Sequence, residues 1–451
     1  MGTERALACA AFACTLAACG GGQTQAPMMP PLGAVPGALQ DSFAQPFRMH
    51  SPIRHVVIVF QENRTPDYLF QGLPGADISK WAIDSQGVPV LLQPISLAAG
   101  YDLGHGHGSF ITDYDDGKMD GFDRGLPPSI HLRPFGYAPA AEVKPYHEMA
   151  AQYVFGDHMF QDNEGPSFPS HLYIISGRAT DEKLEPYYVA ANPREGKSNE
   201  GAPGGCDARD KTTVKTIDPL NGSAGPTPYP CFDFPVLSDL LDDKGVTWRH
   251  YQDNGGPGIW HGFDAVRHVR YGPDYKNVVW PATTVLSDIK KGRLAAVTWI
   301  IPGNTWSDHA GKHSTTQGPS WVAAIVNAIG ESANWKDTAI FVTWDDWGGW
   351  YDHVPPPIDN FYEVGFRVPL IVISPYARRA YVSKKRHDFG SILAFAEETF
   401  GIPKGALHGT DARADDLSDA FDFTQKPRRF KHIKAPPFKP GPYAGLNEED
   451  P

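Results

Sequence analysis

Two apolar stretches of the sequence run directly into carboxylate and amide groups. Residues 56–60 (VVIVF) and 339–344 (AIFVTW) have the composition of buried strands. The polar residues that follow them are Glu62, Asn63, Asp345 and Asp346. Open α/β sheets bind ligands at the carboxyl ends of their strands, and crowded carboxylates need a counter-charge, so these four residues are expected to hold a divalent cation. The alternative is that the pair after the first strand only caps a helix beginning near Pro66.

Histidines in loops add groups that can transfer protons near neutral pH. His105 and His107 are two apart in the glycine-rich segment DLGHGHGSF, a spacing that allows both to face one centre. Further candidates are His309 and His313 in SDHAGKHS and His353 in YDHV. A single histidine is more often structural than functional. Five of them in loops after strands or beside carboxylates are instead candidates for the site.

Ser167 is the candidate nucleophile. It lies in the segment GPSFP, where flanking prolines predict a rigid loop. A hydroxyl is a weak nucleophile unless a base or a metal activates it, and the predicted acidic cluster could supply that activation. The GxSxG elbow of α/β-hydrolases is absent from this segment. A serine with only a turn-forming role is the alternative.

The segments that must position these residues alternate between strand-like and helix-like patterns. Alternation of this kind predicts an α/β fold with a mainly parallel sheet that is covered by helices on both faces. The expected strands are residues 55–60, 246–251, 294–301, 339–344 and 369–374. The expected helices are residues 144–152, 235–243, 320–330 and 388–400.

Composition narrows the class of protein. The chain has 451 residues, of which 41% are hydrophobic and 12% aromatic, enough for a substantial core. Its net charge of −12 argues against a general nucleic-acid binder, which needs a basic face for phosphates.

The first residues have the pattern of an export signal. Arg5 precedes a short apolar stretch that ends in Leu-Ala-Ala-Cys, with Cys19 followed by Gly20. This ending resembles a bacterial lipobox, in which the cysteine becomes the lipidated first residue; a plain secretory signal is the alternative. We therefore expect a lipoprotein signal peptide over 1–18, a flexible tether over 19–51 and a membrane-anchored protein of the cell envelope, in the periplasm or at the outer membrane.

The rest of the chain divides into a catalytic domain over 52–424 and a proline-rich basic tail over 425–451. Within the domain, residues 194–232 are rich in Gly and Pro and are expected to form a surface insertion. Cys206 and Cys231 are the thiols that remain in the folded part, and an even pair in an exported protein predicts a disulfide.

Five ordered motifs resemble the phosphoesterase family, which includes bacterial and plant non-specific phospholipases C and a group of bacterial acid phosphatases. They are QENRTPDYLF, DLGHGHGSFITDYDDGKMDGF, EGPSFPSHLYIISG, WSDHAGKHSTTQGPSWVAAIVNAI and TWDDWGGWYDHVPPP. The resemblance covers roughly 53–424 and implies the three-layer α/β/α fold of the alkaline-phosphatase-like superfamily. It also implies metal or acidic site residues at Glu62, Asn63, Asp345 and Asp346, a nucleophile at Ser167 and site histidines at His105, His107, His309 and, less directly, His353.

Three positions depart from the family pattern. Thr65-Pro66 replaces Ser-Phe, Asp346 stands where Glu is common, and Ser170-His171 stands where the family often has Asn-Arg. These differences bear on substrate contacts more than on the chemistry.

The resemblance implies a metal-dependent phosphoesterase that acts through a phosphoserine, on a phospholipid or on a smaller phosphate ester. Two alternatives come from other features. SFPS begins like the S-x-P-x-R signature of sulfatases, although His171 stands at the arginine position. The 11 Trp and 18 Tyr would also suit a surface lipoprotein that binds glycans without catalysis.

Overall fold

The structure, a computed structural model, describes residues 51–196 and 202–438. The predicted signal peptide, Cys19 and nearly all of the predicted tether lie outside these residues. Within the described ranges, no helix is both long and apolar enough to cross a membrane.

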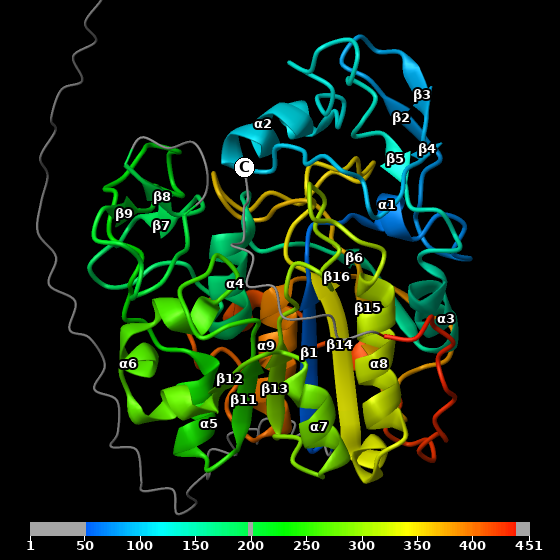
Figure 1. Cartoon of the computed structure of the whole chain (residues 1–451), viewed down its shortest axis with the longest axis vertical. Coiled ribbons are helices and arrows are strands. Elements are labelled where there is room, and N and C mark those ends of the chain that lie inside the picture. Colours follow the sequence, from blue (N-terminus) through cyan, green and yellow to red (C-terminus); the bar gives the residue numbers. More distant parts are fainter. Residues whose placement is uncertain (1–50, 197–201, 439–451) are drawn as a thin grey trace, which may run out of the picture. The chain divides into compact units, whose positions relative to one another are not determined.

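A single large sheet forms the centre of the fold (Figure 1). Its eight strands lie in the order β12-β11-β13-β1-β14-β15-β6-β16. Their bounds are β1 His55–Gln61, β6 Val154–Met159, β11 Trp248–Tyr251, β12 Val278–Val279, β13 Val297–Ile300, β14 Thr338–Trp344, β15 Leu370–Ile373 and β16 Tyr381–His387. Among these strands, β15 alone is antiparallel to its neighbours, so the expectation of a mainly parallel sheet is confirmed.

The two strands that carry the predicted acids are central and adjacent. β1 and β14 are parallel and paired along their whole length, from His55 opposite Thr338 to Gln61 opposite Trp344. Nearly every residue of both strands is buried, as their unbroken apolar sequences predict for strands covered on both faces.

Two longer strands, β6 and β16, were not predicted from the sequence. β6 contains Gly156 and Asp157, which are unfavourable strand residues. β16 is the edge strand, and its central residues Lys384–Arg386 are exposed. A charged edge strand lacks the apolar run by which the other strands were recognised.

Helices cover both faces of the sheet, which confirms the three-layer α/β/α architecture (Figure 1). On one face α8 packs against both α3 and α7. On the other face α4 packs against α5 and α9. The bounds are α3 Lys144–Gln152, α4 Ser167–Ser176, α5 Leu237–Asp243, α7 Thr284–Lys290, α8 Gly318–Gly330 and α9 Phe389–Thr399, with the short helices α6 Arg267–Arg270 and α10 Thr410–Arg413.

A smaller substructure lies beyond the carboxyl ends of the sheet strands (Figure 1). It contains α1 (Pro66–Leu69), α2 (His107–Tyr114) and two small sheets, β2 (Trp81–Ile83) with β3 (Pro89–Leu91) and β4 (Gln93–Pro94) with β5 (Gly136–Tyr137). Its interior is a second apolar cluster, formed by Ala82, Leu92, Phe110, Met119, Phe122, Phe135, Trp347, Tyr351 and Phe366.

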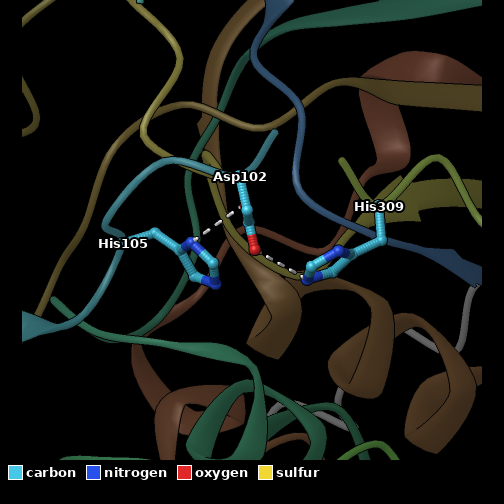
Figure 2. A group of neighbouring side chains, drawn as sticks. All are labelled: Asp102, His105 and His309. Atoms are coloured by element: carbon cyan, nitrogen blue, oxygen red, sulfur yellow. Dashed lines mark ion pairs between the residues drawn. The ribbon is translucent and has the colours of Figure 1, made fainter. Parts of the chain in front are cut away.

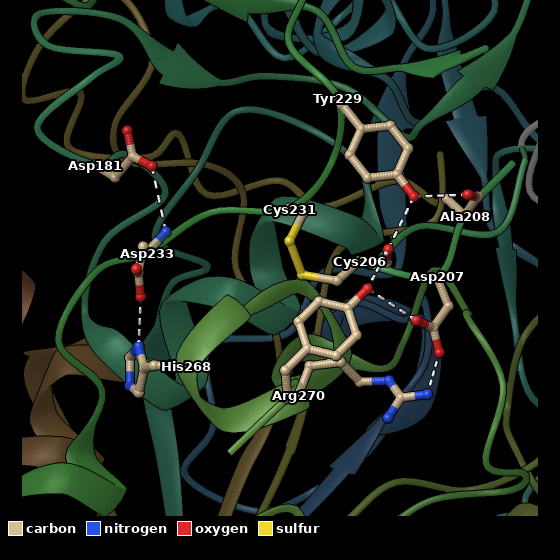
Figure 3. Close-up of a disulfide and its surroundings, with 10 residues drawn as sticks. Asp181, Cys206, Asp207, Ala208, Tyr229, Cys231, Asp233, His268 and Arg270 are labelled. Carbon is tan, nitrogen blue, oxygen red and sulfur yellow. Dashed lines mark hydrogen bonds and ion pairs between the residues drawn. A yellow bond between two sulfur atoms is a disulfide. The ribbon is translucent and has the colours of Figure 1, made fainter. Parts of the chain in front are cut away.

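The predicted disulfide between Cys206 and Cys231 is present (Figure 3). The Tyr229 hydroxyl donates to the carbonyl oxygens of Cys206, at 2.9 Å, and Ala208, at 2.6 Å. The surrounding segment also contributes the short strands β7 (Tyr188–Val189), β8 (Arg194–Glu195), β9 (Thr212–Thr213) and β10 (Thr216–Ile217), which pair in two-stranded sheets outside the central one.

The described part of the basic tail, residues 425–438, packs on the domain. The Trp335 indole donates to the carbonyl oxygen of Arg428 at 2.7 Å, and the Phe430 ring lies 5.0 Å from the Trp335 ring. Farther along, the Phe438 ring lies 5.0 Å from that of Trp321.

Candidate active site

The carboxyl ends of β1 and β14 bring the predicted acids together. The Asp345 amide donates to the carbonyl oxygen of Gln61 at 2.9 Å, which extends the pairing beyond the strands. The Asn63 amide then donates to Oδ1 of Asp345 at 2.8 Å. All four predicted ligands, Glu62, Asn63, Asp345 and Asp346, are fully buried.

Backbone geometry at this edge is tight. Asn63 has a φ of 60°, in the left-handed region that asparagine tolerates better than most residues. Gly348 has a φ of 63°, and a Cβ atom there would lie 2.5 Å from the Asn63 carbonyl oxygen. Only glycine therefore allows the loop after β14 to approach the loop after β1 this closely.

Ser167 is the first residue of α4 and points at the acidic edge. Its hydroxyl donates a hydrogen bond of 3.2 Å to Oδ2 of Asp346. Oδ1 of Asp346 accepts from the Gly348 amide at 2.7 Å, which fixes the carboxylate. The amino end of a helix favours negative charge, so Ser167 is placed where a phosphate group or a developing alkoxide is stabilised.

His171, which was not predicted as a site residue, reaches the same edge from the next turn of α4. Its Nε2 lies 3.0 Å from Oε1 of Glu62. Glu62, His171 and Asp345 each offer a ligand atom, and these atoms all lie within 4.8 Å of one another. The signal in the sequence is the spacing of four between Ser167 and His171, which puts both on one helix face.

The Asn63 side-chain amide can be oriented in two ways. In one, its nitrogen donates to Oε2 of Glu62 at 3.3 Å and Oδ1 of Asp345 at 3.2 Å, and its oxygen accepts from Nε2 of His105 at 3.1 Å. In the other, its nitrogen donates to His105 and its oxygen faces the two carboxylates. The second orientation gathers amide and carboxylate oxygens around one point, which is the ligand chemistry of a divalent cation.

A second observation fits a cation at this point. Oδ2 of Asp345 is buried and has no hydrogen-bond partner among the described residues. A buried carboxylate oxygen without a partner is unfavourable unless an ion compensates it. The donor set of Asn63, Glu62, Asp345 and His171 therefore suits a divalent metal of the imidazole- and carboxylate-binding type.

Asp102 lies between His105 and His309 (Figure 2). Oδ1 of Asp102 is 3.9 Å from Nδ1 of His105, and Oδ2 is 3.9 Å from Nε2 of His309. The two imidazole rings are 5.9 Å apart. Asp102 was not predicted as a site residue, although it lies two positions before the GHGH segment. Asp102 thus joins two of the predicted site histidines.

His107 contacts Glu164 instead of the acidic edge. Its Nδ1 lies 2.9 Å from the Glu164 carbonyl oxygen and 3.7 Å from the Glu164 carboxylate. Burial lowers the pKa of His107 despite the bond to the Glu164 carbonyl. Burial, together with Glu363, raises the pKa of Glu164 to about 8. His107 thus adjoins the loop that leads into Ser167.

His353 belongs to a different cluster from the other predicted histidines. Its Nδ1 lies 2.7 Å from Asp67 and its Nε2 lies 3.1 Å from Asp77. Burial opposes protonation, but the hydrogen bond and charge of Asp67 outweigh it and raise the pKa of His353 to about 9. The buried Arg367 lies nearby and pairs with Asp352 at 2.8 Å.

Asp308, beside His309, connects the histidine loop to the two central strands. Its Oδ2 accepts from the Trp344 indole at 3.0 Å and from the Tyr146 hydroxyl at 2.8 Å. Its amide donates to the side-chain oxygen of Gln61 at 3.1 Å. Gln61 and Trp344 are the last residues of β1 and β14, so the loop is fixed relative to the acids.

Phospholipases C from bacteria and from a plant are similar in sequence to this chain. Phospholipase C A of Mycobacterium tuberculosis is 24% identical over 458 residues, which cover 88% of this chain and 80% of that protein. Non-hemolytic phospholipase C of Pseudomonas aeruginosa is 24% identical over 86% of this chain, which spans 60% of that protein. Non-specific phospholipase C1 of Arabidopsis thaliana is 23% identical, covering 88% of this chain and 76% of that protein.

Among solved structures, a protein of the alkaline phosphatase superfamily from Vibrio parahaemolyticus aligns with a TM-score of 0.39 and 11% identity, over 81% of this chain and 70% of that one. A model of the Phosphoesterase family matches residues 53–403, the range that contains every residue of the site described above. The chain therefore belongs to the Phosphoesterase family and is a hydrolase that acts on phosphoric ester bonds.

Proposed function

We propose that this chain is an exported, metal-dependent phosphodiesterase of the phospholipase C type, which acts through a phosphoserine at Ser167. The observation that carries the proposal is the hydrogen bond from Ser167 to Asp346, beside the cluster of Glu62, His171 and Asp345. The names of the relatives, phospholipases C from bacteria and a plant, support a phospholipid as the substrate.

The first step is attack by Ser167 on phosphorus. The hydroxyl proton passes to Oδ2 of Asp346, which already accepts its hydrogen bond at 3.2 Å. As the bond between Oγ and phosphorus forms, the bond from phosphorus to the leaving alcohol breaks. The amino end of α4 stabilises the negative charge that develops during this exchange.

The leaving alcohol needs a proton, and His309 is the group that we assign to supply it. Its side chain is slightly exposed, at 10%, and the Asp102 carboxylate lies 3.9 Å from its Nε2. His105, held between Asp102 and Asn63, is assigned as a positioning residue.

The second step releases the phosphoryl group. A water molecule attacks phosphorus, its proton passes to His309, and the bond from phosphorus to Oγ breaks. Ser167 regains its proton from Asp346. Over both steps, one phosphodiester and one water are converted to an alcohol and a phosphomonoester. Every side chain returns to its starting protonation state.

Glu62, Asn63, His171 and Asp345 would hold the cation. When bound, a divalent cation there supplies positive charge that offsets the carboxylates and polarises the phosphoryl oxygens. Asp346 was predicted as a ligand as well. Its two oxygens accept hydrogen bonds from the Ser167 hydroxyl and the Gly348 amide, so we assign it the role of proton acceptor instead.

Export and anchoring are part of the proposal. The sequence around Cys19 supports lipidation after removal of residues 1–18. The disulfide between Cys206 and Cys231 supports an oxidising compartment, because such bonds are rare in the cytosol.

Turnover of two chromogenic esters and one lipid would test the proposal. We expect hydrolysis of bis-p-nitrophenyl phosphate and phosphatidylcholine, faster than that of p-nitrophenyl phosphate, and loss of both activities on chelation. Acid quenching during turnover should trap the substituted phosphoryl group on Ser167, as p-nitrophenyl phosphate from bis-p-nitrophenyl phosphate or as phosphocholine from phosphatidylcholine. Preference for the monoester would instead assign an acid phosphatase, and full activity without metal, or no labelled serine, would refute the mechanism.

A further inference from the structure

The hairpin of β2 and β3 carries a concentration of exposed apolar side chains. Four of the eleven large apolar side chains that are exposed in the described part of the chain lie here: Trp81 at 55%, Ile83 at 41%, Val88 at 53% and Leu91 at 46%. Single exposed apolar residues are ordinary, whereas a contiguous group marks a contact surface. We infer that the outer face of this hairpin docks onto the surface of a lipid bilayer, an inference that rests on the proposed phospholipid substrate.

The strand register places these side chains on one face. Trp81 lies opposite Leu91, and Ile83 lies opposite Pro89. Residues directly opposite each other in a pair of strands point to the same side, and alternate residues do so along each strand. The side chains of Trp81, Ile83, Pro89 and Leu91 therefore form one continuous outer surface.

The inner face fixes this surface to the active site. Ala82, between Trp81 and Ile83, is 1% exposed and belongs to the second apolar cluster. The same cluster includes Trp347, which follows Asp346, and Phe110 of α2. The hairpin thus packs on the residues that flank the site, and Figure 1 shows it on the side of the sheet where the strands end.

Charges around the hairpin suit a lipid surface. Residues 85–101 contain no charged side chain, in a protein with a net charge of −12. Two carboxylates beside the hairpin accept hydrogen bonds from its backbone: Asp84 from the Val88 amide at 2.8 Å, and Asp123 from the Ser85 amide at 2.8 Å. Lys80 is exposed and forms no ion pair with a described residue. The uncharged apolar face suits the boundary between lipid headgroups and acyl chains, and the flanking Lys80 suits the lipid phosphates.

The identity of the leading side chain favours lipid over a protein partner. Tryptophan is enriched where an apolar layer meets water, since its ring is apolar and its N–H needs a polar partner. Trp81 stands at the edge of the patch beside Lys80, an arrangement in which the ring enters the boundary and the ammonium stays at the phosphates.

Fluorescence quenching would test the docking directly. Vesicles of phosphatidylcholine brominated in the acyl chains quench indoles that enter the apolar layer. We expect such vesicles to quench the wild-type protein more than the Trp81→Phe variant. Trp280→Phe is the matched control, because Trp280 is 46% exposed and lies outside the hairpin. This difference arises at Trp81 itself, so anchoring elsewhere in the chain does not produce it. Equal quenching of wild type and Trp81→Phe would overturn the inference.

Kinetics separate this inference from the proposed function. The double variant Ile83→Ser with Leu91→Ser should lose about 10-fold in activity on vesicles but keep wild-type activity on soluble bis-p-nitrophenyl phosphate. Leu220→Ser, at a side chain 76% exposed, should keep both. Absence of any phosphodiesterase activity would refute the proposed function while the quenching result still stands. Concentration-dependent dimerisation that the double variant abolishes, without quenching by lipid, would assign the surface to a second copy of the chain.

Discussion

The Ser167 hydroxyl and the Asp346 carboxylate, which are 179 positions apart in the sequence, are joined by a hydrogen bond of 3.2 Å. One comes from the first turn of a helix and the other from the loop after a central strand. Neither residue is exposed to solvent. In the proposed mechanism, this pairing gives the nucleophile its proton acceptor.

Replacement of Ser167 by alanine should remove turnover but leave the fold intact. We expect activity to fall by a factor of ~10³ or more, equivalent to roughly 4 kcal/mol in the barrier. Metal content and thermal stability should stay close to wild type. Ser176→Ala, at the other end of the same helix, is the control, because its hydroxyl bonds to backbone groups of Leu172 and Arg178. Retention of more than about a tenth of wild-type activity in Ser167→Ala would mean that water attacks phosphorus directly.

Metal content and activity should fall together when the proposed ligands are removed. We expect this for Asp345→Ala and for His171→Ala, because each removes one donor of the buried cluster. Elemental analysis of the purified variants, paired with turnover of bis-p-nitrophenyl phosphate, is the measurement. His147→Ala is the control, since His147 lies on α3 and bonds to the carbonyl oxygen of Leu69 in α1. A His171→Ala protein with full metal content would remove that residue from the ligand set.

The assignment of His309 as the proton donor predicts a dependence on the leaving group. An alkoxide is a poor leaving group without a proton, whereas p-nitrophenolate leaves readily. Because His309 also accepts the water proton in the second step, the comparison uses the first step alone, measured before steady state. There His309→Ala should release the alcohol of an alkyl phosphodiester about 10²- to 10⁴-fold more slowly, and p-nitrophenolate from bis-p-nitrophenyl phosphate with a much smaller loss. Equal losses on both substrates would exclude His309 as the donor and favour a role in binding.

Stability should depend on pH through His353. Its pKa is raised from 6.5 to about 9, so the protonated form is favoured in the folded protein. The stabilisation is fully present below pH 6.5 and is lost as the pH rises to about 9. Urea unfolding of wild type between these values should show a decline that His353→Gln lacks. Parallel pH profiles for the two proteins would contradict this coupling to Asp67.

Lipidation at Cys19 can be tested by labelling cells with a fatty acid. The wild-type protein should carry the label, and Cys19→Ala should not, because the thiol is the attachment point in the lipobox pattern. Membrane fractionation of the two proteins gives a second measurement. Equal labelling would show that another position carries the lipid or that the label is not specific.

The parts of the fold that could be predicted are those with strong local signals. The strands β1 and β14 are unbroken apolar runs, so both the strands and the polar residues after them were correctly located. The sequence also predicts in part that these polar residues lie close together, because the carboxyl ends of parallel strands meet at one edge of the sheet. β16 could not be recognised, because a solvent-facing edge strand carries charges where a central strand carries apolar residues.

The missed site residues depend on contacts between distant elements. His171 lies one helical turn after Ser167, the first residue of α4. Its contact with Glu62, which follows β1, depends on how this helix packs beside that strand. Asp102 lies between His105 and His309, which are far apart in the sequence. No local sequence pattern predicts that these two histidines come together. The loop after β14 likewise directs His353 toward Asp67 in α1. His353 is close to Asp346 in the sequence but belongs to a different cluster from the other histidines.

The packing of residues 425–438 has a practical consequence for recombinant production of the protein. A chain truncated at 424 would uncover the rings of Trp335 and Trp321, which Phe430 and Phe438 now cover. Freshly exposed indoles promote aggregation. Affinity tags are therefore better fused after Pro451 than in place of the tail, although the tail is basic and rich in proline.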